Sequence, residues 1–167
     1  MFFVLSSPRS MSYWVTSFLR SSGSRVEHDY SINCSSIKEL EDQNIDGIVD
    51  TAIVHLHNKL VGNKVVLLRD KEEVLESLDK LNIDYDINNL WTKLEEASEK
   101  YPVFYAKDIV SDERKAKIFF EYLTGCGFDK KAWRKLRNVN LQRSIPEIQR
   151  LVNRNKIKIK QLYEGVI

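Results

Sequence analysis

Short, fully apolar runs alternate along this chain with longer segments in which apolar residues recur every three or four positions. Such runs are typical of strands that helices cover on both faces, and the longer spacing is typical of amphipathic helices. The pattern predicts strands at Phe2–Ser6, Arg25–Tyr30, Lys64–Arg69 and Pro102–Ala106, with a weaker one at Gly47–Val49. It predicts helices at Met11–Ser22, Ser36–Asp42, Asp50–Leu60, Lys71–Leu81, Asn88–Tyr101, Ser111–Leu123, Lys130–Asn138 and Ile145–Asn153.

This alternation predicts an α/β fold, a three-layer sandwich around a central parallel sheet of about four to five strands. The chain has no internal repeat, low-complexity segment or linker, so residues 1–167 are expected to form a single domain. Its C-terminal part, about residues 128–167, is expected to be helical. Ligands of parallel sheets bind beyond the carboxyl ends of the strands, which places Ser6–Ser12 and Arg69 at the same edge.

The first predicted strand ends in a small, polar and basic segment that leads directly into a predicted helix. The first N–H groups of a helix lack intrahelical partners, and the helix dipole adds about half a positive charge there. Arg9 adds a full charge, and Ser10 and Ser12 add hydroxyl donors. We therefore expect a phosphate or sulfate group to bind at this turn. The turn lacks the G-x-x-x-x-G-K-[ST] pattern, so a conventional nucleoside triphosphatase loop is not supported.

A second basic strand end follows the apolar run that closes at Leu68. Arg69 stands at this end, and Ser77 follows eight positions later on the next predicted helix. A guanidinium presents a planar fork to phosphate oxygens, and a hydroxyl adds a neutral donor, so the two side chains would suit a second anion. The alternative is that Arg69 pairs with Asp70 or Glu73 while Ser77 is merely solvated.

These two segments resemble the nucleotide-binding motifs of sulfotransferases. Ser7-Pro8-Arg9-Ser10-Met11-Ser12-Tyr13-Trp14 resembles their 5′-phosphosulfate loop, usually Pro, a basic residue, Ser, Gly, Thr, Thr and Trp. Val65-Val66-Leu67-Leu68-Arg69-Asp70, with Val74 and Ser77, resembles their 3′-phosphate motif. Tyr105-Ala106-Lys107-Asp108-Ile109, followed by Asp112, is similar to a later strand-to-helix segment of the family, and the similarity spans about residues 1–125.

The chain also departs from the family pattern. Met11 stands in place of the loop Gly, Tyr13 in place of the second Thr, and Lys71 in place of a Pro. The family's C-terminal Gly-rich basic loop is not found, and the chain is short for the family.

The resemblance implies a fold like that of the P-loop nucleoside triphosphate hydrolases and a PAPS-dependent transferase activity. A sulfuryl group would pass from 3′-phosphoadenosine 5′-phosphosulfate to a hydroxyl or amine of a small-molecule or glycan acceptor, leaving adenosine 3′,5′-bisphosphate. The residues expected to bind the nucleotide are Arg9, Ser10, Met11, Ser12, Tyr13, Trp14, Arg69 and Ser77, with no metal ion. Arg9 would also stabilise the charge that develops on the leaving phosphate. Trp14 either stacks on the adenine or packs beneath the loop.

A base must take the proton of the acceptor, and the end of the second strand carries Glu27, His28 and Asp29. Strand alternation places Glu27 and Asp29 on one face and His28 on the other. We expect Asp29, ahead of His28, to be the catalytic base. The alternative is a polar strand end without chemistry.

Two other functions compete with a sulfotransferase. A small kinase would use the same loop for a nucleoside triphosphate, but it needs a loop lysine and an acidic strand end for magnesium. A non-catalytic nucleotide- or anion-binding module would suit the bulky Met11 and Tyr13 and the missing C-terminal loop.

His55 and His57, two positions apart on a predicted helix, face apart and make a poor metal pair. Asp50-Thr51 is expected to cap that helix, with a substrate-facing role as the alternative.

Composition narrows the expected partners. With 26 basic and 24 acidic side chains the net charge is +2, so we expect no nucleic-acid partner, although the last third is locally basic. That basic surface is interpreted as a solvated helical face, with anion steering as the alternative. Cys34 and Cys126 lie far apart without metal-ligand spacing, which indicates a reduced, cytoplasmic protein. The opening apolar run is too short for a membrane span and has no basic n-region.

Overall fold

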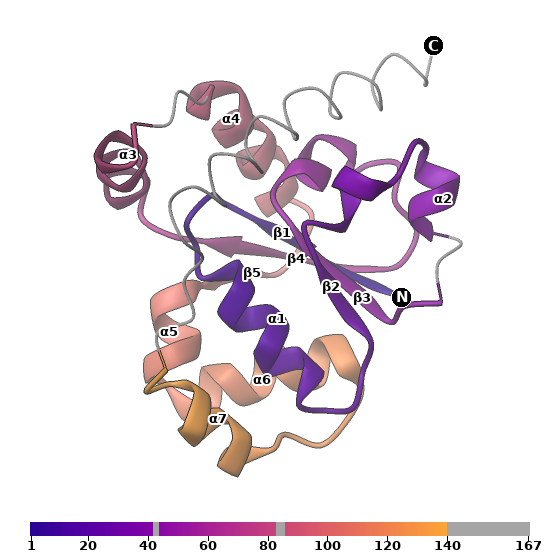
Figure 1. Cartoon of the computed structure of the whole chain (residues 1–167), viewed down its shortest axis with the longest axis vertical. Helices are drawn as coiled ribbons and strands as arrows, with labels where there is room; N and C mark the ends of the chain where they lie inside the picture. The colour runs from indigo at the N-terminus through magenta and orange to yellow at the C-terminus, as the bar shows by residue number, and fades with distance from the viewer. Residues whose placement is uncertain (42–43, 83–85, 140–167) are drawn as a thin grey trace.

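The computed structural model describes residues 1–41, 44–82 and 86–139 (Figure 1). Its centre is a single sheet of five strands in the order β2-β3-β1-β4-β5, and every neighbouring pair is parallel. The strands are β1 (Phe2–Ser6), β2 (Val26–His28), β3 (Gly47–Asp50), β4 (Asn63–Leu68) and β5 (Val103–Tyr105). The predicted α/β class and parallel sheet are confirmed.

Helices cover both faces of the sheet (Figure 1). They are α1 (Ser12–Arg20), α2 (Ile37–Glu41), α3 (Lys71–Lys80), α4 (Ile87–Ser98), α5 (Ala106–Ser111), α6 (Glu113–Thr124) and α7 (Lys130–Leu136). Two short 3₁₀ helices, η1 (Tyr30–Asn33) and η2 (Ala52–Leu56), follow β2 and β3. In the described part of the chain, none of these helices has the length and apolar content needed to cross a membrane.

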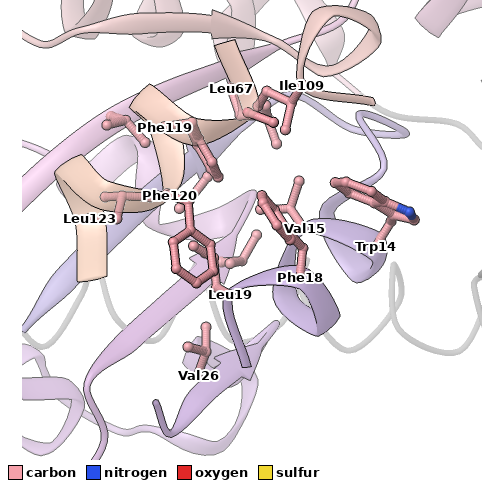
Figure 2. Packing of buried hydrophobic residues seen from close by; sticks show 14 of the residues in the cluster. Trp14, Val15, Phe18, Leu19, Val26, Leu67, Ile109, Phe119, Phe120 and Leu123 are labelled. Atoms are coloured by element: carbon pink, nitrogen blue, oxygen red, sulfur yellow. The ribbon is translucent and has the colours of Figure 1, made fainter. Parts of the chain in front are cut away.

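Alternation along the central strand β1 divides the core in two. Phe2 and Val4 point to the face covered by α1, α5, α6 and α7, while Phe3 and Leu5 point to the face covered by η2, α3 and α4. Figure 2 shows the first of these clusters, where Phe18 of α1 lies against Phe120 of α6 with ring centroids 5.0 Å apart. Both faces of β1 are therefore buried among apolar side chains, and polar groups that could bind a ligand lie at the ends of the strands.

Local signals place several elements where the sequence predicts them. β1 has the predicted bounds, and α3 begins at Lys71 because the Asp70 carboxylate accepts hydrogen bonds from the N–H groups of Glu72 and Glu73. Gly125, at φ 65°, ends α6 in the left-handed conformation that glycine adopts without strain.

Three predicted elements are wrong in extent or type. The helix predicted at Asp50–Leu60 is instead the end of β3, where Asp50 pairs with Leu5, followed by η2. The helix predicted at Ser111–Leu123 starts later, because Asp112 is extended and caps α6, and the shorter α5 precedes it. The second strand stops at His28 because Asp29 turns to φ 50°. The helix predicted at Ile145–Asn153 lies outside the described residues.

Candidate functional site

The predicted site residues gather at one edge of the sheet. Because all five strands are parallel, their carboxyl ends share this edge, which we call the carboxyl edge. The β1–α1 loop (Ser7–Met11) leaves it from β1, and the β4–α3 junction leaves it from the neighbouring strand β4. His28 and Asp29 follow β2, two strands from β1 on the other side.

The β1–α1 loop turns sharply through two left-handed residues. Arg9 has φ 59° and Met11 has φ 62°, a conformation that costs a residue other than glycine about 1 kcal/mol or more. Met11 thus takes the backbone conformation that glycine adopts most easily, at the position where the family motif has its Gly. Helix α1 begins directly after it, and the Val15 N–H donates to the Met11 carbonyl at 2.9 Å. The N–H groups before Val15 are those that a helix start leaves for a ligand.

Ser10, between these two residues, is fully buried, and its Oγ has no hydrogen-bond partner among the described residues. A buried hydroxyl without a partner costs about 1–3 kcal/mol relative to one that is hydrogen-bonded. The loop is also fastened to β4, since Ser7 Oγ accepts the Arg69 N–H at 3.0 Å. A buried hydroxyl that has no partner, in a loop held by a hydrogen bond to the end of β4, is suited to bind an oxygen-rich ligand.

The structure brings the two predicted basic strand ends together. Arg9 Nε donates to Ser77 Oγ at 3.0 Å, and Arg69 Nη1 donates to the Arg9 carbonyl at 3.2 Å. Burial, and next the neighbouring Arg69 charge, lower the pKa of Arg9. Arg69 also donates to Glu73 at 2.8 Å, so the alternative pairing that the sequence left open is present as well. Two cationic side chains and a hydroxyl therefore converge from two separate strand–helix units.

His28, the last residue of β2, lies between the start of α1 and the Asp29 carboxylate. Its Nε2 is 2.8 Å from the Oγ of Ser12, the first residue of α1. Its Nδ1 is 2.9 Å from the Asp29 carboxylate, which approaches as an ion pair and not as an aligned hydrogen bond. The expectation that His28 and Asp29 lie on opposite faces is therefore wrong, because the left-handed turn at Asp29 breaks the strand alternation. Glu27 instead pairs with Arg20 at 3.0 Å, a contact exposed to solvent.

Asp50, which the sequence assigned to a helix cap, is a buried member of this group. Its Oδ2 accepts the Ser31 N–H at 3.0 Å and the Ser31 hydroxyl at 2.6 Å, and its Oδ1 accepts the Ala52 N–H at 2.7 Å. Burial and the nearby Asp29 charge raise the pKa of Asp50 to about 6 despite these hydrogen bonds. A single Asp at the end of an apolar strand was the signal in the sequence that a carboxylate is buried at this edge.

The aromatic residues after the loop divide between core and surface. The Trp14 side chain is buried in the α1–α6 cluster (Figure 2), and its Nε1 donates to the Leu136 carbonyl at 2.8 Å. Of its two predicted roles, Trp14 therefore has the one in which it packs beneath the loop. It is not available to stack on an adenine. Tyr13 is exposed, and its ring meets the His28 ring edge-on with centroids 5.5 Å apart. The Met11 side chain is exposed as well.

The remaining candidates form no second centre. His57 is buried beside Glu96, 3.8 Å away, and burial lowers the pKa of His57. Within the described ranges, no group of three or more His, Cys, Asp or Glu side chains could hold a metal ion. Neither Cys34 nor Cys126 is in a disulfide; Cys34 is buried and its thiol donates to the Tyr30 carbonyl at 3.6 Å, whereas Cys126 is exposed.

Comparison of the chain with protein-family models, with curated proteins and with solved structures finds no significant match.

Proposed function

We propose that this protein is a sulfotransferase that moves a sulfuryl group from 3′-phosphoadenosine 5′-phosphosulfate to a hydroxyl or amine acceptor. One observation carries the proposal: Arg9 and Arg69, from neighbouring strand ends, lie together, and Ser77 of α3 accepts a hydrogen bond from Arg9. Two anionic groups of one nucleotide would offset the repulsion between these guanidinium groups. The P-loop-like character of the fold is part of the same proposal.

The residues present fit the donor. The β1–α1 loop would take the 5′-phosphosulfate on Arg9, on the buried Ser10 hydroxyl and on the first N–H groups of α1. Arg69 and Ser77 would take the 3′-phosphate in exchange for their present partners, Glu73 and Arg9. When bound, the donor supplies a sulfuryl group and a leaving phosphate. A donor group placed where charge grows on that phosphate contributes about 3 kcal/mol to transition-state stabilisation.

In this proposal His28, and not Asp29, is the base. His28 Nε2 already meets a hydroxyl at the β1–α1 loop, whereas the Asp29 carboxylate lies on the far side of the ring, at Nδ1. Asp29 would stabilise the imidazolium that forms when His28 takes the proton of the acceptor. As the acceptor oxygen forms its bond to sulfur, the bond from sulfur to the phosphate oxygen breaks and its electron pair leaves with the phosphate.

The acceptor is proposed to be a small molecule or a glycan, with no nucleic acid and no membrane as partner. Neither cysteine is in a disulfide, which is consistent with the reducing conditions of the cytoplasm, the compartment that we propose.

Nucleotide selectivity tests the proposal. By titration calorimetry, adenosine 3′,5′-bisphosphate should bind more tightly than adenosine 5′-phosphate, and Arg69→Ala should lower bisphosphate affinity by about 10- to 100-fold. The same variant should weaken binding of the monophosphate less than binding of the bisphosphate, because only the bisphosphate carries the 3′-phosphate. Arg20→Ala is the matched control, because Arg20 pairs with Glu27 on the surface.

Transfer of labelled sulfate from the donor to a panel of hydroxyl and amine acceptors separates an enzyme from a binding module. Equal affinity for the two nucleotides, or preference for magnesium–ATP, would contradict the proposal. The second result would favour the kinase alternative.

A further inference from the structure

One hydroxyl group at the carboxyl edge belongs to both halves of the proposed site. Ser12 opens α1, where the helix start faces the proposed anion, and its Oγ lies 2.8 Å from His28 Nε2. The two residues are 16 positions apart in the sequence and reach each other only because β2 and α1 meet at this edge.

The hydroxyl of Ser12 has a single proton to donate. We assign the ring proton of His28 to Nδ1, the nitrogen that lies 2.9 Å from the Asp29 carboxylate. Nε2 then carries the lone pair, and the Ser12 hydroxyl is its donor. An anion at the start of α1 competes for that same proton, so one of the two acceptors must lose it.

We propose that Ser12 couples the two functions of the site. An anion bound at the β1–α1 loop accepts the hydrogen bond of the Ser12 hydroxyl and thereby frees the Nε2 lone pair of His28. This inference rests on the proposed function, because it assumes that the anion is the phosphosulfate of the donor. Without donor, the base is occupied by a side chain of the protein itself. With donor, the lone pair is free for the acceptor's proton, so the donor binds first in productive turnover.

The charged groups around His28 act in the same direction. From its own segment Asp29 faces Nδ1, and from β3 the buried Asp50 interacts electrostatically with Asp29. From α1, Tyr13 contributes a ring edge and no formal charge. An anion added on the Nε2 side places negative charge on both sides of the imidazole. No bond to Ser12 forms or breaks in this coupling, and only its hydroxyl proton changes acceptor.

Nitrogen NMR of the histidine rings tests the coupling, with inorganic sulfate as the probe. The chain has only three histidines, so ¹⁵N-histidine labelling and a His28→Gln variant assign the ring signals of His28. Saturating sulfate should move the Nε2 signal of His28 in the wild-type protein. Ser12→Ala should shift that signal already without sulfate, weaken sulfate binding by about tenfold and reduce the response to sulfate by about half or more.

Two variants guard the interpretation. Ser12→Thr keeps the hydroxyl and should respond as the wild type does. Ser17→Ala removes a hydroxyl from the same helix, one that donates to the Tyr13 carbonyl at 3.1 Å, and it should change nothing. His28 signals that ignore saturating sulfate, or that respond equally in Ser12→Ala, would overturn the coupling. So would a sulfo ester on Ser12 after incubation with donor, because the hydroxyl would then be a nucleophile.

These outcomes are separate from those of the proposed function. Equal binding of the bisphosphate and the monophosphate would overturn sulfuryl transfer while leaving the response of His28 to sulfate intact. Conversely, a selective bisphosphate site with an unresponsive His28 would leave the proposed function in place and remove the coupling alone.

Discussion

The two halves of the carboxyl edge differ in charge although they belong to one continuous sheet. Beyond β1 and β4 lie two guanidinium groups, Arg9 and Arg69, whereas beyond β2 and β3 lie His28 and the carboxylates of Asp29 and Asp50. A cationic half beside an acidic half separates tasks that would interfere if mixed. The first half suits an anion, and the second suits the transfer of a proton.

The halves also differ in how the chain stabilises them. The cationic half turns through two left-handed residues, Arg9 and Met11, on either side of the Ser10 hydroxyl, which has no partner among the described residues. The acidic half contains a left-handed residue as well, Asp29. The acidic half relies on buried hydrogen bonds, since three donors from Ser31 and Ala52 hold the Asp50 carboxylate. The first arrangement leaves donors for a ligand, and the second uses its donors internally.

The largest expected effect comes from removing the proton acceptor of the acidic half. His28→Gln should lower kcat by about 100- to 10,000-fold, because a general base contributes that much to the rate. Bisphosphate affinity should change by less than about threefold, since the cationic half is untouched. Steady-state kinetics and titration calorimetry measure the two quantities.

Glu27→Gln is the matched control on the same strand, because Glu27 pairs with Arg20 at the surface. It should leave kcat within about twofold of wild type, as exposed ion pairs contribute little. If His28→Gln instead lost nucleotide affinity while keeping kcat, the assignment of the two halves would be reversed.

Asp50→Asn should change how stability depends on pH. The pKa of Asp50 is raised in the folded protein to about 6 from its ordinary value of 3.8, so folding favours its protonated form. This group therefore destabilises the protein as pH rises from about 4 to about 6, by on the order of 3 kcal/mol in all. The asparagine lacks this titration, and its amide group is a poorer hydrogen-bond acceptor for the Ala52 N–H. The variant should thus be less stable than wild type by more near pH 4.5 than at pH 7.

Urea unfolding at the two pH values measures this difference directly. A penalty that grows toward pH 7 would mean that Asp50 is ionised without cost, and that its three hydrogen bonds outweigh burial and the Asp29 charge.

The smallest expected effect concerns the strained backbone of the cationic half. Met11→Gly removes the side chain at φ 62° and gives the loop easier access to its conformation. Relief of strain and the greater freedom of glycine in the unfolded chain oppose each other, so the free energy of unfolding should change by less than about 1 kcal/mol. Sulfate and bisphosphate should bind about threefold more tightly, because the backbone can approach the anion more closely.

Asn82→Gly is the control, since Asn82 also has a positive φ, 51°, but follows α3 away from the carboxyl edge. A gain in affinity in both variants would point to general loosening of the protein, and a loss in Met11→Gly would show that the side chain itself contacts the ligand.

The sequence predicted those parts of the molecule whose causes are local. The apolar run of β1 and the Asp70 cap of α3 are each written within a few neighbouring residues, and both were predicted with the right bounds at those ends. The approach of Arg9 to Arg69 was also predictable in outline, because parallel neighbouring strands must end at the same edge.

Contacts between distant segments explain what the sequence could not predict. The burial of Asp50 depends on Ser31, 19 positions earlier, and the inward position of Trp14 depends on Leu136, 122 positions later. The meeting of His28 with Asp29 depends on a left-handed turn that Asp tolerates but does not dictate. The position of Asp50 after an apolar run hints at a buried carboxylate, but the partner residues in these three contacts have no signature in spacing or composition.

The hydrogen bond from the Trp14 indole to the Leu136 carbonyl makes the end of α7 a support for the first turn of α1. A chain shortened before Leu136 would leave a buried indole N–H with no acceptor and an open side to the aromatic cluster. The loss, about 1–3 kcal/mol for the N–H alone, would fall on the helix whose start frames the β1–α1 loop. Shortened versions of this protein should therefore retain α7 as far as Leu136, even when only ligand binding is wanted.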